Sequence, residues 1–428
     1  MPEKRRSFLK KIGQVSLGAS VLGFNNFAIE NVEAAAKHIT HLTPEQVAQE
    51  EGFWYQVQKA WVQSPHFINL ENGYFSPQPT EVMDAQVKNV QMINEMPSFY
   101  MRRRQIEEHK GVKQLLANFA GCTPEEIAIT RNTTEALDTV IAGLDLKKGD
   151  EAIMTNQDYG SMLAAFDQQS RRYGIKNKII NLPLHPKSDQ EILDLYEQQM
   201  TKRTKVILVT HLINISGHIL PAKKLADLAH SRGIEVIVDA AHSFAQLNFK
   251  IPDLNADYLG TSLHKWLCTP LGLGMLYIKK DKIKNVWPLF GDSTYKPDDI
   301  RKLEHIGTRP CSAVLTIANA IRFHQSIGSK RKEARLRYLK NYWVNRVKDL
   351  PKVKINTPFE DNRSCAIANI AIKGMTPNEL AEYFYKKHRI FTVAINNIAV
   401  KGVRVTPHLY TTTHDLDKFV KAIEQVGK

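Results

Sequence analysis

The sequence predicts an α/β protein: a large domain with a mostly parallel β-sheet between layers of helices, and a smaller α+β domain. From residue 112 onward, short runs of strand-forming residues alternate with helical patterns. Most of these runs are apolar along their whole length, which is typical of parallel strands buried on both faces. The chain has 428 residues, of which 43% are hydrophobic and 24% charged, so it is long enough for two domains.

The large domain is predicted over residues 72–300, around a seven-stranded sheet. The predicted strands are 126–130, 150–155, 177–183, 205–210, 235–241, 256–262 and 274–279. The predicted helices between them are 131–144, 161–174, 189–200 and 222–233. Parallel neighbours need long crossover connections, and helices of this length supply them.

The smaller domain is predicted over residues 301–428, where the pattern changes to α+β. Helical patterns cover 312–327 and 331–349, and a final helix begins at about 414. Apolar strand patterns lie at 366–372, 391–395 and 402–406. The preceding stretch, residues 37–71, is mostly helical, and we expect it to pack on the smaller domain.

The first 36 residues have the layout of an export signal. Arg5-Arg6-Ser7-Phe8-Leu9-Lys10 fits the twin-arginine pattern, and small residues at Ala34–Ala36 form a cleavage motif. An ordinary amphipathic helix is the alternative. We expect the twin-arginine translocase to export the folded chain to the periplasm and the mature chain to begin near Lys37. No run of about 18 apolar residues occurs, so we expect no stable membrane anchor.

Composition argues against several classes of function. The formal net charge is +14, but the basic residues are spread along the chain without a nucleic-acid-binding motif, so we expect no nucleic-acid partner. The four cysteines, Cys122, Cys268, Cys311 and Cys365, form no C-x-x-C pair, and H-E-x-x-H is absent from the sequence. We therefore expect no metal site.

Four chemical features follow predicted strands or open predicted helices. Thr133 and Thr134 open a helix, where free N–H groups bind anions; a plain N-cap is the alternative. Asp239 ends a buried strand, where its carboxylate needs a cationic partner or serves as a cap. Lys265, in "TSLHKWLCTPLGLG", lies in apolar surroundings that make an amine nucleophilic, unless it is a solvated edge residue. "GTRP" at 307–310 offers a further anion site. Pyridoxal 5′-phosphate needs a phosphate site, a carboxylate and a lysine that forms a Schiff base. In this sequence the three candidates for these roles follow one another along the chain in that order.

The motifs together resemble class V aminotransferases, the fold-type I enzymes that use pyridoxal 5′-phosphate. The resemblance covers residues 66–425 and rests on "NGYFSPQPTEV", "NTTEAL", "VDAAHS", "SLHKWL", "GTRP" and "RVTPHLYTT", in the family's order. It is nearest to the isopenicillin-N epimerase-like branch, which also includes exported enzymes that tailor siderophores. The resemblance implies a fold-type I PLP-transferase fold.

The resemblance implies roles for residues around the cofactor ring. Lys265 would bind the cofactor as a Schiff base and shuttle protons, and Asp239 would pair with the ring nitrogen. Tyr159 would stack on the ring. Asn214 and His242 would bond to its phenolic oxygen.

The resemblance also implies roles at the phosphate and the substrate. The phosphate would be held by Thr133, Thr134, Ser262 and His264. Thr308 would reach the phosphate of a neighbouring subunit, which implies a homodimer with shared sites. Arg404 would clamp the carboxylate of a small amino substrate; a surface arginine at a strand end is the alternative.

The expected function is that of a PLP-dependent enzyme acting on the Cα of an amino acid or of an amino-acid-derived, peptidic or siderophore substrate. Aminotransferase activity is favoured, with epimerase or β-lyase activity as alternatives. Cysteine desulfurases of this class need a cysteine before the C-terminal arginine, and "FTVAINNIAVKGVRVTP" has none. A non-catalytic basic binding protein is the rival from another class, but a decayed enzyme would have lost Lys265 or Asp239.

Overall fold

The larger β-sheet holds the polar residues that the sequence singles out. In the computed structural model, which describes residues 27–428, this sheet has seven strands in the order β2-β8-β7-β6-β5-β3-β4. They are β2 (Ile127–Thr130), β3 (Glu151–Thr155), β4 (Lys176–Ile180), β5 (Thr204–Thr210), β6 (Glu235–Asp239), β7 (Tyr258–Ser262) and β8 (Gly274–Ile278). Each overlaps a predicted strand, and the α/β fold is confirmed.

One strand of this sheet runs against the others. β8 pairs antiparallel with both β2 and β7, whereas β3, β4, β5, β6 and β7 pair in parallel. A short loop, residues 263–273, therefore joins β7 to β8 and stays at the carboxyl end of β7. That loop carries Lys265.

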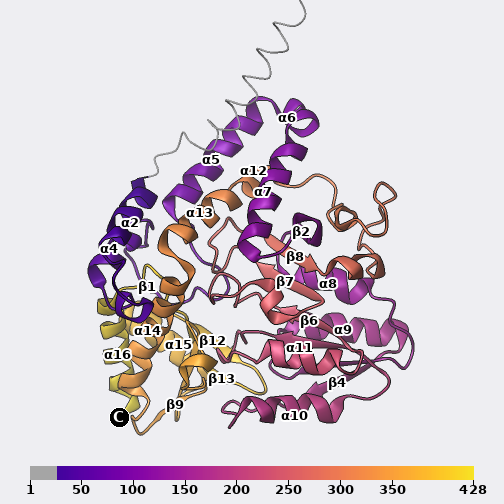
Figure 1. Ribbon diagram of the computed structural model, residues 1–428. Coiled ribbons are helices and arrows are strands. Elements are labelled where there is room, and N and C mark those ends of the chain that lie inside the picture. Colours follow the sequence, from indigo (N-terminus) through magenta and orange to yellow (C-terminus); the bar gives the residue numbers. More distant parts are fainter. Residues whose placement is uncertain (1–26) are drawn as a thin grey trace, which may run out of the picture.

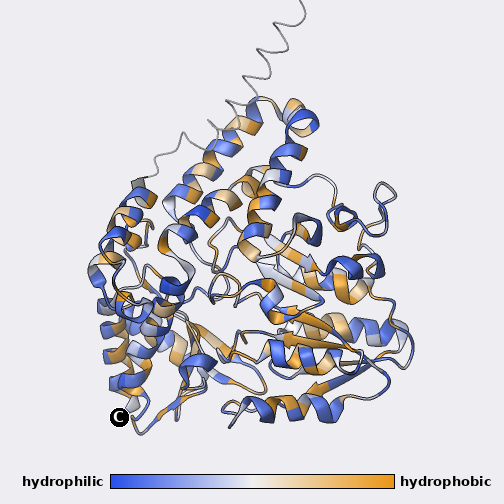
Figure 2. Cartoon of the chain, viewed as in Figure 1, coloured by the Kyte–Doolittle hydropathy of each residue, from blue (hydrophilic) through white to orange (hydrophobic). Residues whose placement is uncertain are grey.

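Helices cover both faces of the larger sheet (Figure 1). One face packs on α8 (Thr133–Gly143) and α9 (Gly160–Tyr173); the other packs on α7 (Gln105–Ala120), α10 (Asp189–Gln199) and α11 (Ala222–His230). Successive residues of β5 alternate between the two layers: Val206 and Leu208 face the first, and Ile207 and Val209 face the second. Accordingly, the central strands are mostly hydrophobic in Figure 2, while the helices mix hydrophobic and hydrophilic residues.

The smaller part is an antiparallel sheet with helices. Its strand order is β12-β13-β10-β9, and a separate buried cluster surrounds it. Its elements are α14 (Ser329–Val347), β9 (Val353–Ile355), β10 (Ala368–Ile372), α15 (Pro377–His388), β12 (Val393–Asn396), β13 (Lys401–Val405) and α16 (Thr413–Gly427).

The N-terminal elements pack onto later parts of the chain. They are α2 (Phe27–Lys37), α3 (Pro44–Val47), α4 (Glu51–Gln58) and β1 (Ile68–Asn69), which pairs with β11 (Ile390–Phe391). α3 contacts α14, and Arg335 of α14 pairs with Glu51 at 2.6 Å. Ile29 and Val32 of α2 are fully buried, so the predicted signal boundary at residue 36 falls inside a packed helix. The twin-arginine pattern itself lies outside the described residues.

A group of helices stands beside the sheet on the side of α7. They are α5 (Thr80–Glu95), α6 (Pro97–Arg103), α12 (Cys311–Leu315) and α13 (Ile317–Ile327). The single helix predicted over 312–327 is divided at Thr316, whose hydroxyl donates to the Ala313 carbonyl at 2.7 Å. α13 packs against α2, α5 and α7, so this segment lies with the helices beside the larger sheet.

Short 3₁₀ turns complete the chain at η1 (Pro124–Glu126), η2 (Ile251–Leu254), η3 (Lys280–Asn285), η4 (Ile300–Leu303) and η5 (Asp361–Arg363). Between residues 27 and 428, no helix combines the length and the apolar character needed to cross a bilayer. The same residues contain no cluster of metal-ligating side chains.

Candidate active site

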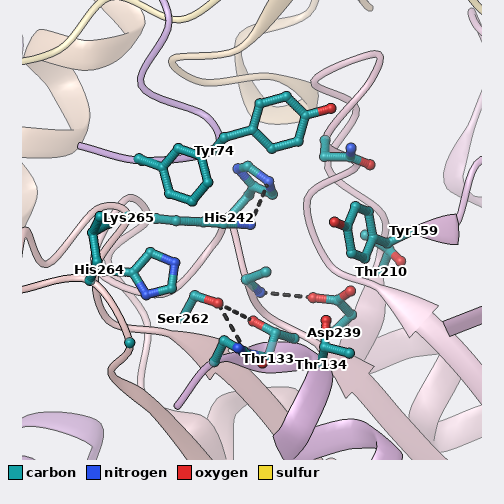
Figure 3. Close-up of a pocket in the computed structure, with 16 residues that line it drawn as sticks. Tyr74, Thr133, Thr134, Tyr159, Thr210, Asp239, His242, Ser262, His264 and Lys265 are labelled. Carbon is teal, nitrogen blue, oxygen red and sulfur yellow. Dashed lines mark hydrogen bonds between the residues drawn. The ribbon is translucent and has the colours of Figure 1, made fainter. Parts of the chain in front are cut away.

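The candidate site is a cavity of about 260 Å³ at the carboxyl ends of β5, β6 and β7 (Figure 3). Ligands of open α/β sheets bind at this edge because the loops that follow the strands diverge there. Nine predicted site residues line the cavity: Thr133, Thr134, Tyr159, Asn214, Asp239, His242, Ser262, His264 and Lys265. Thr308 and Arg404 do not line it.

The first turn of α8 forms one end of the cavity. Asn132 caps the helix by accepting a hydrogen bond from the Glu135 amide, which leaves the N-terminal groups of α8 facing the site. The Thr133 amide donates to Ser262 Oγ at 3.0 Å, and the two hydroxyls are 2.7 Å apart. A helix N-terminus with hydroxyl donors suits a phosphate.

Gly274 lets β8 lie close to this turn. A Cβ atom at position 274 would lie 2.7 Å from the backbone nitrogen of Asn132. A side chain there would push α8 away from the sheet and displace the anion site.

Asp239 lies at the end of β6 with 3% of its surface exposed. Burial raises the pKa of its carboxyl, while an Ala241 amide bond at 2.9 Å and the nearby Lys265 lower it. A buried carboxylate at the floor of a cavity is stabilised by a cation placed next to it. The protonated nitrogen of a pyridine ring would be such a cation.

The Lys265 side chain points into the cavity toward His242 (Figure 3). Its Nζ lies 3.1 Å from His242 Nε2. Burial lowers the pKa of Lys265 to about 8, with Asp239 opposing that shift. Burial likewise holds the pKa of His242 well below its usual value, so the imidazole is neutral. With a pKa of about 8, part of the Lys265 amine is uncharged near neutral pH and most of it is uncharged above about pH 8. The uncharged amine is the form that attacks carbonyl carbons.

Two residues that we did not single out support the base of the site. Thr210 lines the cavity, and its hydroxyl donates to Asp158 Oδ1 at 2.6 Å. The Thr155 amide donates to the other oxygen of Asp158 at 2.6 Å. Burial raises the pKa of Asp158 to about 7. In the sequence, Asp158 is marked only by its position beside Tyr159 after β3. That position alone does not distinguish a site residue from an ordinary loop residue.

The mouth of the cavity is aromatic and apolar. Tyr74, Phe75 and Leu271 line it, and Phe75 and Leu271 are 61% and 63% exposed. Phe75 stacks on His264, with ring centroids 6.1 Å apart. Tyr74 and Phe75 belong to the motif "NGYFSPQPTEV", for which the sequence alone indicates no role in the site.

Arg404, expected to clamp a substrate, is already paired within the chain. It is fully buried, and its Nε and Nη2 donate to Glu71 at 3.1 and 2.7 Å. Nη1 donates to the Asn214 carbonyl at 3.2 Å, and the Tyr74 ring lies 4.2 Å from Cζ. No sequence motif singles out Glu71. Thr308 is exposed and lies outside this cavity.

Residues 68–419 match the family described as "Aminotransferase class-V". The chain belongs to the class-V aminotransferase family. It is 24% identical over 388 residues to an isopenicillin N epimerase of Streptomyces clavuligerus, covering 87% of this chain and 98% of that protein. It is 25% identical to a cysteine desulfurase of Haloferax volcanii, covering 83% of this chain and 88% of the other.

Solved structures share the fold. A cysteine desulfurase from Thermococcus onnurineus aligns with a TM-score of 0.74 at 22% identity, covering 86% of this chain and 99% of that one. A cystine C-S lyase in complex with cysteine persulfide aligns with a TM-score of 0.78 at 19% identity, covering 85% of this chain and 99% of the other. The fold-type I architecture is thereby confirmed.

The donor set fits the cofactor of this family. An anion site at α8, a buried carboxylate at β6 and the amine of Lys265, whose pKa is lowered to about 8, surround one cavity. The amide oxygen of Asn214 is buried without a hydrogen-bond partner in the described residues, so a polar ligand group has a place there. Family membership and these residues identify the cofactor as pyridoxal 5′-phosphate.

Proposed function

We propose that this chain is a PLP-dependent aminotransferase acting at the Cα of an amino acid or an amino-acid-derived substrate, including peptidic and siderophore compounds. The observation that carries the proposal is the Lys265 amine, whose pKa is lowered to about 8 by burial and which faces the same cavity as the buried carboxylate of Asp239. When bound, the cofactor supplies an electron sink that acidifies the Cα–H bond of an amino compound.

The chain's own residues hold reactants and move protons. The α8 N-terminus, with Thr133, Thr134 and Ser262, binds the phosphate. Asp239 keeps the ring nitrogen protonated. Lys265, as a free amine, removes the Cα proton and returns it as general acid.

Aminotransfer needs a single proton-transferring group, and the site offers Lys265, the one primary amine among the described residues that line the cavity. Epimerisation needs a second proton donor on the opposite side of Cα. Tyr159, which would lie over the ring on that side, has a phenol that can act in this way. Epimerase activity remains the second candidate because isopenicillin N epimerases match this chain along 98% and 99% of their lengths.

Cysteine desulfurase activity receives no support from the site. Of the four cysteines, all within the described residues, none lines the cavity, and Cys268, Cys311 and Cys365 are buried. The desulfurase reaction needs a thiol that reaches the substrate.

A screen of amino compounds in deuterated water tests the proposal. Each compound is offered with a keto acid, and keto product, chirality and Cα deuterium are measured separately. A new keto acid with stoichiometric amine transfer supports the aminotransferase. Racemised, deuterated substrate without keto product would favour the epimerase. A purified protein without the visible absorption of lysine-bound cofactor would favour a non-catalytic binder.

We further propose a homodimer in which Thr308 completes the phosphate site of the other subunit. Gly307, with φ +74°, and Thr308 are both exposed, so a second subunit could contact this loop directly. A Thr308→Val variant should weaken cofactor binding while a sizing column still finds a dimer. A monomer of wild-type protein would contradict this arrangement.

We propose that the twin-arginine translocase exports the folded chain to the periplasm. Replacing Arg5 and Arg6 with lysine should leave the loaded enzyme in the cytoplasm, as cell fractionation would detect. N-terminal sequencing then locates the processing site. A start near Lys37 agrees with the alanine motif, whereas a start before Ile29 keeps the packed helix α2.

A further inference from the structure

Three neighbouring side chains form a hydrogen-bonded series that ends at the Lys265 amine. Trp266 Nε1 donates to His242 Nδ1 at 3.4 Å, and His242 Nε2 lies 3.1 Å from Lys265 Nζ. Trp266 directly follows Lys265 in the sequence but points away from the cavity and is fully buried. The two side chains thus reach the same imidazole from different sides.

The direction of each hydrogen bond follows from the indole. An indole N–H can only donate, so His242 Nδ1 must accept. The imidazole is neutral because it is buried and close to Lys265, which holds its pKa well below the usual value. A neutral ring that accepts at Nδ1 carries its proton on Nε2. The Nε2–H therefore donates to the lone pair of the Lys265 amine.

This bond stabilises the uncharged form of Lys265. A neutral amine has a lone pair to accept the Nε2–H, whereas a protonated amine has none and would point a hydrogen at another N–H. The indole thus acts on Lys265 through His242.

Trp266 is held in place by the residues behind it. Its ring stacks on His408 with centroids 5.5 Å apart and an interplanar angle of 17°. Its carbonyl accepts a hydrogen bond from the ammonium of Lys332, which is buried. The His242 carbonyl in turn accepts from Gln246 Nε2 at 2.7 Å. These contacts fix both rings relative to the cavity.

Other charged groups also act on Lys265. Asp239 and Glu71 raise its pKa, and Arg404 lowers it. His264 is neutral, because burial lowers its pKa to about 4. All of these groups remain when the indole N–H is removed, so they form a constant background for a test.

We propose that Trp266 is a positioning residue: its indole N–H fixes the tautomer of His242, which favours the unprotonated form of the Lys265 amine and directs it into the cavity. The inference builds on the proposed function, in which Lys265 binds the cofactor. The inference concerns the Lys265 amine before the cofactor binds, so it can be tested on the cofactor-free chain independently of catalysis.

The test measures how the reactivity of Lys265 depends on pH in the full-length chain freed of cofactor. The protein is acetylated briefly with acetic anhydride over a pH series, and mass spectrometry compares Lys265 with the exposed Lys147. Only the neutral amine reacts. In Trp266→Phe the midpoint for Lys265 should move up by about half to one pH unit, corresponding to roughly three- to tenfold. Nitrogen NMR of the His242 ring should change from Nε2-protonated to a mixture of tautomers.

A matched control separates this effect from loss of packing. Trp343 is fully buried in the smaller part, and its Nε1 finds no partner among the described residues, so Trp343→Phe should leave the midpoint unchanged. Benzothienylalanine at position 266 replaces the N–H by sulfur in a ring of the same shape and should act like Trp266→Phe. An unchanged midpoint in both position-266 variants, or an equal shift in Trp343→Phe, would overturn the inference.

The proposed function fails by a different result. If wild-type Lys265 reacts with acetic anhydride but the full chain never acquires the visible band of lysine-bound cofactor, the cofactor role of Lys265 is wrong. If the band forms and Trp266→Phe keeps the wild-type midpoint, the role of Trp266 alone is wrong.

Discussion

The hydroxyl of Ser262 joins the end of β7 to the first turn of α8: it lies 3.0 Å from the Thr133 amide and 2.7 Å from the Thr133 hydroxyl. Two segments that are 129 residues apart in the sequence thus present one group of donors to the cavity. Their position sets where the cofactor phosphate sits.

Ser262→Ala should lower the affinity for pyridoxal 5′-phosphate by about tenfold, because one hydroxyl is lost and Thr133 is no longer held. Fluorescence titration of the cofactor-free chain measures the change. Ser243 is buried with an unpartnered hydroxyl in the described structure, so Ser243→Ala is the matched control. Equal affinities in both variants would remove Ser262 from the phosphate site.

Lys265→Ala should abolish both the visible band and turnover, since no other primary amine among the described residues lines the cavity. We expect at least a thousandfold loss of turnover, in keeping with the removal of a nucleophile that is also the base. Lys265→Arg keeps a positive charge but cannot form the covalent link. It should therefore fail in the same way, and activity in either variant would exclude Lys265.

Asp239→Asn should keep the cofactor and lose most of its turnover, because a neutral amide cannot hold the ring nitrogen protonated. Absorbance gives occupancy, and steady-state kinetics give turnover. Asp257, a buried carboxylate that accepts from the Val236 amide at 2.8 Å, offers Asp257→Asn as a comparison. Similar turnover in the two variants would mean that Asp239 has no special part in the reaction.

Asp158 should make the stability of the protein depend on pH. Burial raises the pKa of its carboxyl from 3.8 to about 7, so the folded chain holds a proton that the unfolded chain releases within this range. The free energy of unfolding therefore falls as pH rises from about 4 to 7, by at most about 1.4 kcal/mol per unit. Asp158→Asn should flatten this slope. Urea denaturation of both proteins at pH 5, 6 and 7 compares the slopes, and parallel curves would refute the assignment.

Glu71→Gln should lower the free energy of unfolding by about 3 kcal/mol, because it leaves the buried guanidinium of Arg404 without its counter-ion. Arg335 is as buried as Arg404, but its partner Glu51 is 46% exposed, so water screens that pair, and Arg335 also donates to the Ala48 carbonyl. Glu51→Gln should therefore cost about 1 kcal/mol or less. Chemical denaturation measures both. If Glu71→Gln lowered the free energy of unfolding less than Glu51→Gln, the Glu71–Arg404 pair would not be an important contribution to stability.

The seven strands could be predicted because buried parallel strands leave a strong apolar signal. The direction of β8 could not, since a strand that is apolar on both faces reads the same in either direction. The break at Thr316 was also missed, because "SAVLTIANAI" keeps an apolar pattern across the kink. The break between α12 and α13 depends on how the two helices pack on their neighbours, and local composition does not show this.

Site residues could be predicted where a motif combines a strand end with unusual chemistry, as at Asp239 and Lys265. Glu71 and Asp158 were not singled out, since a carboxylate before a glycine turn or in a loop is ordinary. Their importance comes from partners that only the folded chain brings near. For Glu71 that partner is 333 residues away.

This separation has a consequence for biosynthesis. Glu71 is synthesised 333 residues before Arg404, so the pair can form only after β13 has left the ribosome. A prematurely terminated chain without β13 would keep a carboxylate with no counter-ion and a strand β10 with one edge unpaired. Such a fragment is a substrate for cellular proteases. The ion pair therefore distinguishes chains that include β13 from shorter fragments that lack it.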